Sequence, residues 1–128
     1  MPEVDAKATF KRLLANGPLT QIPKRAADQL LIARLAGTRF QPGRQYAEKE
    51  VNETLTSWLS TFFAEHGIDY ATLRRFMVDM RILTRDRACT HYQVNEAGLA
   101  GVDAMLDPAK ILVEASAERA ARRQKHAG

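Results

Sequence analysis

Apolar side chains recur every three or four residues in five parts of the chain, a spacing that places them on one face of an α-helix. The predicted helices span residues 5–15, 23–37, 48–65, 70–80 and 107–124. The first ends at Asn16-Gly17-Pro18. The second begins at Pro23, because a missing backbone donor is harmless in a first turn. Its buried stripe is expected to consist of apolar residues, namely Ala27, Leu30, Leu31 and Leu35.

The third predicted helix has the most strongly apolar face and is expected at the centre of the core. Its apolar residues are Val51, Leu55, Trp58, Leu59, Phe62 and Phe63. The alternative for its aromatic residues is an exposed patch that binds a partner chain.

The fourth predicted helix is amphipathic. Asp69 precedes it and is predicted to be its N-cap, since a carboxylate can accept hydrogen bonds from the free amides of the first turn. The side expected to face the core carries Tyr70, Leu73, Met77 and Met80. The side expected to face solvent or a ligand carries Ala71, Arg75, Val78 and Asp79.

Strand character is short and local. Residues 82–85 and 91–94 flank a polar turn at 86–89, which predicts a β-hairpin. Residues 44–46 follow a Pro-Gly turn and are long enough for a minimal strand. Residues 96–106 contain two glycines and are expected to form a loose helix or an irregular connection, before a helix that begins at Asp107-Pro108.

The order of these elements indicates the fold class. Helix, short strand, two helices and a hairpin match a winged helix, in which a two-stranded wing follows a helix-turn-helix. We therefore expect a mainly α domain with a small β-hairpin, specifically a winged helix-turn-helix with extra N- and C-terminal helices. Residues 1–128 are predicted to form a single domain with its core at about 22–94.

Composition narrows the class of protein. Apolar residues make up 45% of the chain and charged residues 27%, which excludes a disordered or fibrous sequence as the starting assumption. The chain has no run of roughly 20 apolar residues, and its first ten residues carry charges where a signal peptide would be apolar. We expect a cytoplasmic protein with no membrane association.

The formal net charge of +4 suits an anionic partner, provided the surplus is clustered. Lys and Arg concentrate at residues 24–25, along 74–87, and in a tail that comprises Arg119, Arg122, Arg123 and Lys125. Nucleic acid, specifically double-stranded DNA, is the expected partner, and the tail is expected either to reinforce that binding or to be a solvated helix face.

Metal and thiol chemistry are not expected. The single cysteine, Cys89, cannot form an internal disulfide, and the three histidines are far apart in sequence with no ligand spacing between them. Cys89 has basic neighbours but no adjacent histidine base, so we expect it to be inert. No metal and no cofactor are predicted.

Several short motifs occur together in a recognisable order. They are IPK at residues 22–24, FQPG at 40–43, YAEKEVN at 46–52 and DYATLRR at 69–75, continued by VD at 78–79 and LTR at 83–85. With these motifs, the segment from about 22 to 92 resembles the bacterial domain-of-unknown-function family 2087. The resemblance implies a compact winged-helix-like domain, often linked to transcriptional regulators, and supplies no reaction or ligand.

The chain departs from the family pattern in two ways. Ala47 stands where Ser is expected, so the capping box that ends at Glu50 is expected to be lost, at about 1 kcal/mol of helix stability. The third helix is also predicted to be longer than usual by about two turns, over residues 57–65.

The candidate nucleic-acid contacts lie on the fourth helix and the hairpin. They are Thr72, Arg74, Arg75, Arg85 and Arg87. Two of the arginines also have an alternative role, since Arg75 can pair with Asp79 one turn later and Arg74 can fold back onto Asp69 or onto a carboxylate of the preceding helix. His91 is expected, with Arg85 and Arg87, to press the wing against the nucleic-acid backbone, and Tyr92 either covers the core or stacks on a base.

Two other functions compete with nucleic-acid binding by a small transcriptional regulator or accessory factor. One is a protein-interaction module or homodimer that uses the exposed helix face, the aromatic helix or the C-terminal helix. The other is an enzyme, which has the weakest support. It requires a cleft that joins Glu48, Asn52, Asp69 and Arg74. We expect no catalytic activity.

Overall fold

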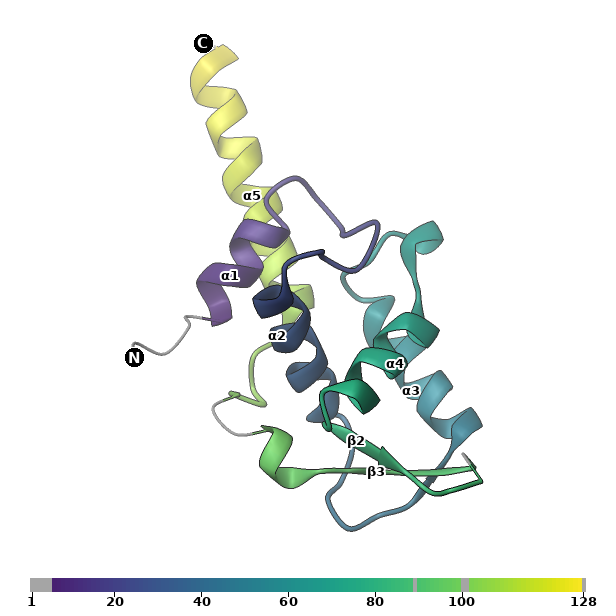
Figure 1. Ribbon diagram of the computed structural model, residues 1–128. Coiled ribbons are helices and arrows are strands. Elements are labelled where there is room, and N and C mark those ends of the chain that lie inside the picture. Colours follow the sequence, from purple (N-terminus) through teal and green to yellow (C-terminus); the bar gives the residue numbers. More distant parts are fainter. Residues whose placement is uncertain (1–5, 89, 100–101, 128) are drawn as a thin grey trace.

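The computed structural model describes residues 6–88, 90–99 and 102–127 of the chain (Figure 1). The helices are α1 (Ala6–Leu13), α2 (Ala26–Gly37), α3 (Glu48–Leu59), α4 (Tyr70–Asp79) and α5 (Pro108–Ala127). The strands are β1 (Tyr46–Ala47), β2 (Leu83–Arg85) and β3 (His91–Val94), and two 3-10 turns are η1 (Glu65–Gly67) and η2 (Glu96–Leu99). The expected class, mainly α with a small β-hairpin, is confirmed.

The strands form one antiparallel sheet in the order β1-β3-β2. The hairpin pairs Leu83 with Val94, and the earlier strand pairs Tyr46 with Tyr92. A short strand that precedes α3 thus joins the edge of the later hairpin, which is the arrangement of a winged helix-turn-helix. The helix-turn-helix is α3 and α4, and β2 and β3 form the wing. The helices α1 and α5 are the extra N- and C-terminal helices outside this motif.

The core is centred where α3 meets the other helices. Phe62 is 1% exposed, and its ring makes edge contacts with Trp58 at 4.8 Å and with Phe10 of α1 at 6.0 Å between centroids. Trp58 and Phe63 are also buried. The aromatic residues therefore belong to the core, as predicted, and do not form an exposed patch.

Helix α3 ends at Leu59, so the predicted extension through residues 57–65 is wrong. The hydroxyl of Ser60 donates to the Ser57 carbonyl at 2.6 Å, and that of Thr61 donates to the Trp58 carbonyl at 2.7 Å. These bonds close the last turn, after which Phe63 lies beside Leu19 in an isolated bridge. The helical periodicity continued past the helix only because a turn and a bridge bury the next two aromatic rings.

Helix α2 begins at Ala26, three residues after the predicted start at Pro23. The side chain of Gln29 donates to the carbonyls of Pro23 and Lys24, which are thereby held outside the helical ladder. The buried face also differs from the predicted stripe: Leu35 is fully buried, whereas Leu30 and Leu31 are only partly buried and Ala27 is exposed.

Asp28 explains this rotation of the α2 face. Its side chain is 6% exposed and accepts a hydrogen bond of 2.8 Å from Arg12 of α1. A buried charge needs such a partner. The polar residue therefore occupies a core-facing position that the hydrophobic pattern assigned to solvent.

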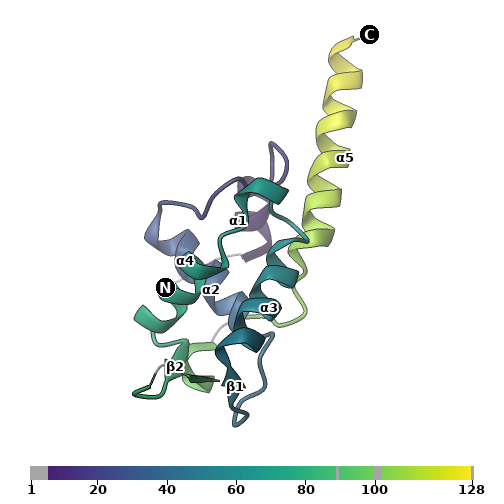
Figure 2. The same ribbon diagram turned by 90° about the vertical axis from the view of Figure 1, so that its right-hand side faces the viewer.

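Helix α1 is held against α5 by ion pairs. Lys7 lies 3.7 Å from Glu114, and Lys11 lies 3.0 Å from Glu118. Among the α5 residues whose side chains the structure describes, 108–124, only those of the first turns are buried, namely Pro108, Ile111 and Ala115. Beyond them the helix projects away from the rest of the molecule, at the end opposite the strands (Figure 2). As predicted, α5 begins at Asp107-Pro108, where the Asp107 side chain accepts from the Ala109 amide at 3.0 Å.

None of the helices formed by the described residues has the length and apolar character needed to cross a membrane.

Candidate nucleic-acid interface

Helix α4 starts where the sequence predicts it. The carboxylate of Asp69 accepts from the Thr72 amide at 3.0 Å and from the Thr72 hydroxyl at 2.6 Å. These bonds, the hydroxyl bond first, lower the pKa of Asp69 below its ordinary value, and the charge of Arg75 acts in the same direction. Asp69 is therefore the N-cap of α4 and remains ionised near neutral pH.

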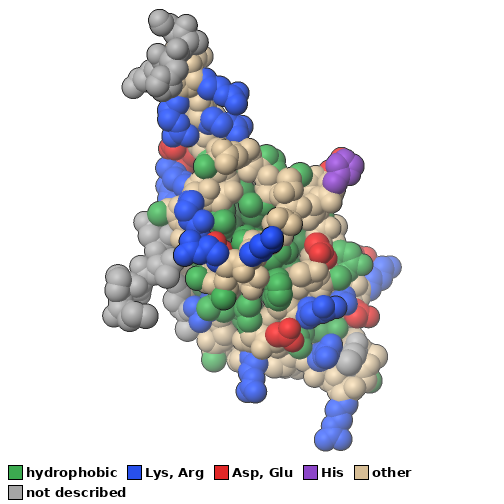
Figure 3. Space-filling model, turned by 45° about the horizontal axis from the view of Figure 1, so that its top comes forward, with side chains coloured by type: hydrophobic (Ala, Val, Ile, Leu, Met, Phe, Trp, Pro, Cys, Tyr) green, Lys and Arg blue, Asp and Glu red, His purple; other side chains and the backbone are tan. Residues whose placement is uncertain are grey.

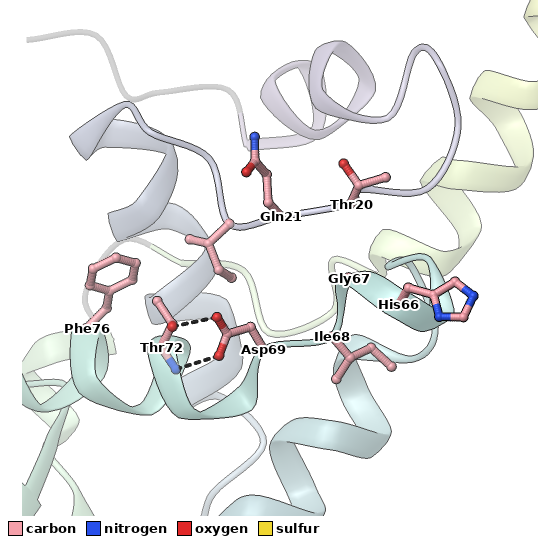
Figure 4. A pocket seen from close by; sticks show the side chains of 9 residues that line it. Thr20, Gln21, His66, Gly67, Ile68, Asp69, Thr72 and Phe76 are labelled. Carbon is pink, nitrogen blue, oxygen red and sulfur yellow. Dashed lines mark hydrogen bonds between the residues drawn. The ribbon is translucent and has the colours of Figure 1, made fainter.

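Thr72 is bound to this cap and does not face the candidate interface. It lines a hollow of about 400 Å³ between the N-terminus of α4 and the segment that precedes α2 (Figure 4). In the close-up, Thr72 and Asp69 point toward each other, with Thr20 and Gln21 on the facing segment. Sequence reasoning placed Thr72 among the nucleic-acid contacts, whereas its observed bonds serve the helix cap.

The inward side of α4 agrees with the expected pattern at its centre. Leu73 and Met77 are fully buried, and Met80 is partly buried. Tyr70, predicted to face the core, is 37% exposed, which corrects that expectation. Tyr70 is the first residue of the helix and precedes the turn that packs onto α3. Of the four residues predicted to face the core, only the two central ones, Leu73 and Met77, are therefore fully buried.

The outward side of α4 and the adjacent strand enclose an open hollow of about 400 Å³, which we call the α4–β2 groove. Its lining consists of five α4 residues and one β2 residue: Ala71, Arg74, Arg75, Val78, Asp79 and Arg85. Three of the predicted contacts, Arg74, Arg75 and Arg85, are thus brought together in one place. The polar lining is mainly cationic, with a single carboxylate.

Arg74 is turned toward α3. Its guanidinium donates to the side-chain oxygen of Asn52 and lies 3.5 Å from the Glu48 carboxylate. Glu48 also accepts from the Tyr92 hydroxyl at 3.4 Å. The predicted alternative, in which Arg74 folds back onto a carboxylate of the preceding helix, is confirmed for Glu48. Arg74 still borders the groove, with its side chain 23% exposed.

Three of the four residues that the enzyme alternative would bring together lie in this cluster. Glu48, Asn52 and Arg74 meet, but both oxygens of Asp69 bond to Thr72 instead. The arrangement connects α3, α4 and β3, and its chemistry is that of a cross-link between elements.

Arg75 is exposed and points away from the core. In the part of the chain that the structure describes, it forms no hydrogen bond or ion pair, and the pair with Asp79 that the spacing allows is not formed. The side chain of Arg85 is equally exposed and, within the same described ranges, without a hydrogen bond. Both guanidinium groups are available to an anionic ligand.

The wing turn is held by Asp86. Its carboxylate accepts from the amide and the hydroxyl of Thr90, both at 2.7 Å, and from the His91 amide at 3.2 Å. The hydroxyl bond, followed by the amide bond, lowers the pKa of Asp86 to about 2. Sequence reasoning missed this role, although an Asp at the start of a turn is a known signal for side-chain bonds to the backbone. Arg87 lies in this turn and is exposed.

Two further residues of the wing, His91 and Tyr92, come directly after this turn in the sequence. The His91 ring, expected to contact a nucleic-acid backbone, lies 3.4 Å from the Asp86 carboxylate within the hairpin. Tyr92 is 2% exposed and packs in the core, which excludes the alternative in which it stacks on a base.

The basic tail lies far from the groove. Arg122 and Arg123 are exposed on the projecting part of α5, while the groove and wing lie at the opposite end of the molecule in both ribbon views (Figures 1 and 2). In the space-filling view, blue side chains lie along α5 and also over the middle and lower parts of the domain (Figure 3). The tail and the groove therefore lie at opposite ends of the molecule.

The described residues contain no group of three or more His, Cys, Asp or Glu side chains able to hold a metal ion. Cys89 and the Lys125 side chain, both singled out in the sequence, fall outside what the structure describes.

A family model described as "Uncharacterized protein conserved in bacteria (DUF2087)" matches residues 18–94. The matched segment contains α2 through β3, and hence the whole α4–β2 groove, but not α1 or α5. No curated protein and no solved structure matched the chain.

Proposed function

The chain belongs to this family of uncharacterised proteins conserved in bacteria, and from that premise we propose that it binds double-stranded DNA through the α4–β2 groove, as a small transcriptional regulator or accessory factor. One observation carries the proposal: Arg75 of α4 and Arg85 of β2 line the same open hollow, and neither forms a hydrogen bond or ion pair within the described part of the protein. A helix and a wing that each present a free guanidinium on one side suit a polyanion.

The shape of this surface favours a DNA duplex over an RNA duplex. A helix of α4's length, Tyr70–Asp79, presents about 15 Å of exposed face. The major groove of B-DNA admits an α-helix, whereas that of A-form RNA is too narrow for side chains to read. With α4 in the major groove of the DNA, the exposed Arg87 of the wing turn is placed to contact the flanking phosphate backbone.

The bonding of each predicted contact defines its role in the proposal. Arg75, Arg85 and Arg87 contact the duplex. Arg74, which borders the groove, fixes the position of α4 against α3 through Asn52. Thr72 caps the helix.

The competing proposal, a protein-interaction module or homodimer without nucleic-acid binding, is supported by a different region. Val113 on α5 is 69% exposed and Met105, just before α5, is 87% exposed. Both lie outside the segment that the family model matches. A partner chain would therefore cover the α5 side and leave the groove free.

The test is a salt-dependent titration of a fluorescent random-sequence duplex, followed by anisotropy. We expect binding at about 50 mM salt that weakens steeply toward about 200 mM. Arg75→Gln/Arg85→Gln should weaken binding and lower the magnitude of the slope of log K against log salt by about 1, because Arg85 on the wing neutralises a phosphate whereas Arg75 on the helix faces the base edges. The matched control is Arg122→Gln/Arg123→Gln, which removes the same charge from α5 and should change affinity less. Absence of binding by the wild type at the lower salt concentration, or an equal decrease in affinity for the two variants, would refute the proposal.

A further inference from the structure

Asp79 is the one acidic side chain in the α4–β2 groove. It is exposed, lies in the last turn of α4, and within the described ranges makes no hydrogen bond or ion pair. Arg75 stands one turn earlier on the same side of the helix and lines the same hollow. Arg75 and Asp79 thus present opposite charges to the same groove without forming an ion pair with each other.

A carboxylate at this position lowers the DNA affinity of a protein that contacts only phosphates. Each anionic group brought near the DNA backbone is repelled, and this repulsion weakens binding to every sequence alike. On a helix docked in the major groove, the base edges face the middle of its outward side and the phosphates face its flanks. Asp79 is therefore compatible with binding where it meets a base that offers a hydrogen-bond donor.

The chemistry of the base edges selects that base. Cytosine presents an amino group with no acceptor beside it on its own major-groove edge, whereas adenine presents its amino group next to the N7 acceptor, which repels a carboxylate. Guanine and thymine offer acceptors only. A carboxylate thus prefers cytosine, while the free guanidinium of Arg75 suits the two acceptors of guanine.

The spacing on the helix fits two neighbouring base pairs. Four residues of α-helix advance about 6 Å along the axis. Successive base pairs are separated by about 3.4 Å. Arg75 and Asp79 therefore address positions one or two base pairs apart, and the small apolar Ala71 and Val78 that share the groove can pack against thymine methyl groups.

We infer that Asp79 is a specificity-determining residue: α4 recognises a guanine through Arg75 and, one or two base pairs away, a cytosine through Asp79. This inference rests on the proposed function, since it requires a docked duplex. Asp79 lowers affinity for arbitrary DNA and restores it only on the sequence that satisfies its carboxylate.

The test is selection of bound duplexes from a randomised pool, followed by sequencing, with the wild type, Asp79→Asn and Arg75→Ala. The wild type should enrich a guanine and a nearby cytosine, and Arg75→Ala should no longer enrich the guanine. Asp79→Asn should bind the unselected pool more tightly, because it removes a negative charge, and should change the preferred base at the second position from cytosine to adenine, whose N6 and N7 match an amide. We expect the preference at that position to change by at least about fivefold, the lower end of the discrimination of a good base contact.

The matched control is Glu65→Gln, which also removes one exposed carboxylate, outside the groove. It should leave the selected sequence unchanged. The inference is overturned if the wild type binds duplexes without base preference, or if Asp79→Asn selects the wild-type sequence. Either result leaves the proposed function standing, whereas failure of every variant to bind any duplex overturns both. The thermal unfolding midpoint of Asp79→Asn should be no lower than that of the wild type, because within the described ranges the carboxylate makes no hydrogen bond or ion pair that the substitution could remove.

Discussion

The guanidinium of Arg74 donates to the side-chain oxygen of Asn52, which ties the outward helix α4 to α3 across 22 positions of sequence. The neighbouring Arg75 faces the open groove without a hydrogen bond inside the described part of the protein. Two adjacent arginines thus have different tasks: one fixes the orientation of α4, and the other is exposed for a ligand.

Removing the Arg74 cross-link should therefore destabilise the fold. Arg74→Ala leaves the partly buried Asn52 and the exposed Glu48 without their cation, and we expect the free energy of unfolding to fall by about 1–2 kcal/mol. Asn52→Ala should give a similar decrease, and the double variant should be destabilised by less than the sum because both substitutions remove one interaction. Urea unfolding of the four proteins measures this coupling. Strict additivity would show that the cross-link contributes nothing.

The N-terminus of α3 contains half of a capping box. The Glu50 carboxylate accepts from the Ala47 amide at 3.2 Å, so the expected loss of the box is only partial. The other half is missing, since alanine has no hydroxyl to accept from the backbone amide of Glu50.

Ala47→Ser should supply this missing acceptor. The backbone of Ala47 is already extended, at φ −67° and ψ 154°, as an N-cap requires. We expect stabilisation of about 0.5–1 kcal/mol, seen as a rise of a few degrees in the thermal unfolding midpoint. Ala47→Val, with no hydroxyl and no preference for the N-cap position, is the control and should not stabilise. A midpoint equal to the wild type in Ala47→Ser would contradict this account of the cap.

The wing turn should be resistant to acid. Because the folded pKa of Asp86 is lowered to about 2 from an ordinary value of 3.8, its contribution to stability is complete above pH 3.8 and is lost only as the pH falls from there toward 2. Carboxyl NMR titration should place the Asp86 midpoint well below that of an unbonded aspartate. Thr90→Val removes the hydroxyl bond that lowers this pKa most and should raise the midpoint toward 3.8. An unchanged midpoint in that variant would refute the assigned cause.

Local signals in the sequence predicted the elements that have a local cause. Asp69 caps α4, Pro108 opens α5, and the hairpin flanks a polar turn, each because the chemistry lies within a few residues. The family motifs lie within the same region that the winged helix occupies.

Two errors arose where the cause is distant in sequence. The buried face of α2 depends on Arg12, whose partner Asp28 lies 16 positions away. The end of α3 depends on the bridge between Phe63 and Leu19, which periodicity cannot reveal. The start of α2 is an error with a nearby cause, since the Gln29 side chain bonds to the Pro23 carbonyl six positions earlier. In the site, the exposure of Arg75 was predicted from helix geometry, whereas the role of Thr72 was missed although its bonds with Asp69 lie within one turn of helix.

The central claim, that the α4–β2 groove is the surface that meets DNA, is tested most directly by mapping amide chemical shifts as a short duplex is added to the isotope-labelled protein. We predict shifts concentrated in α4 around Arg75 and in β2 and the wing turn from Arg85 to Arg87, with α5 little affected. Shifts confined to α5, or none at low salt, would contradict the account.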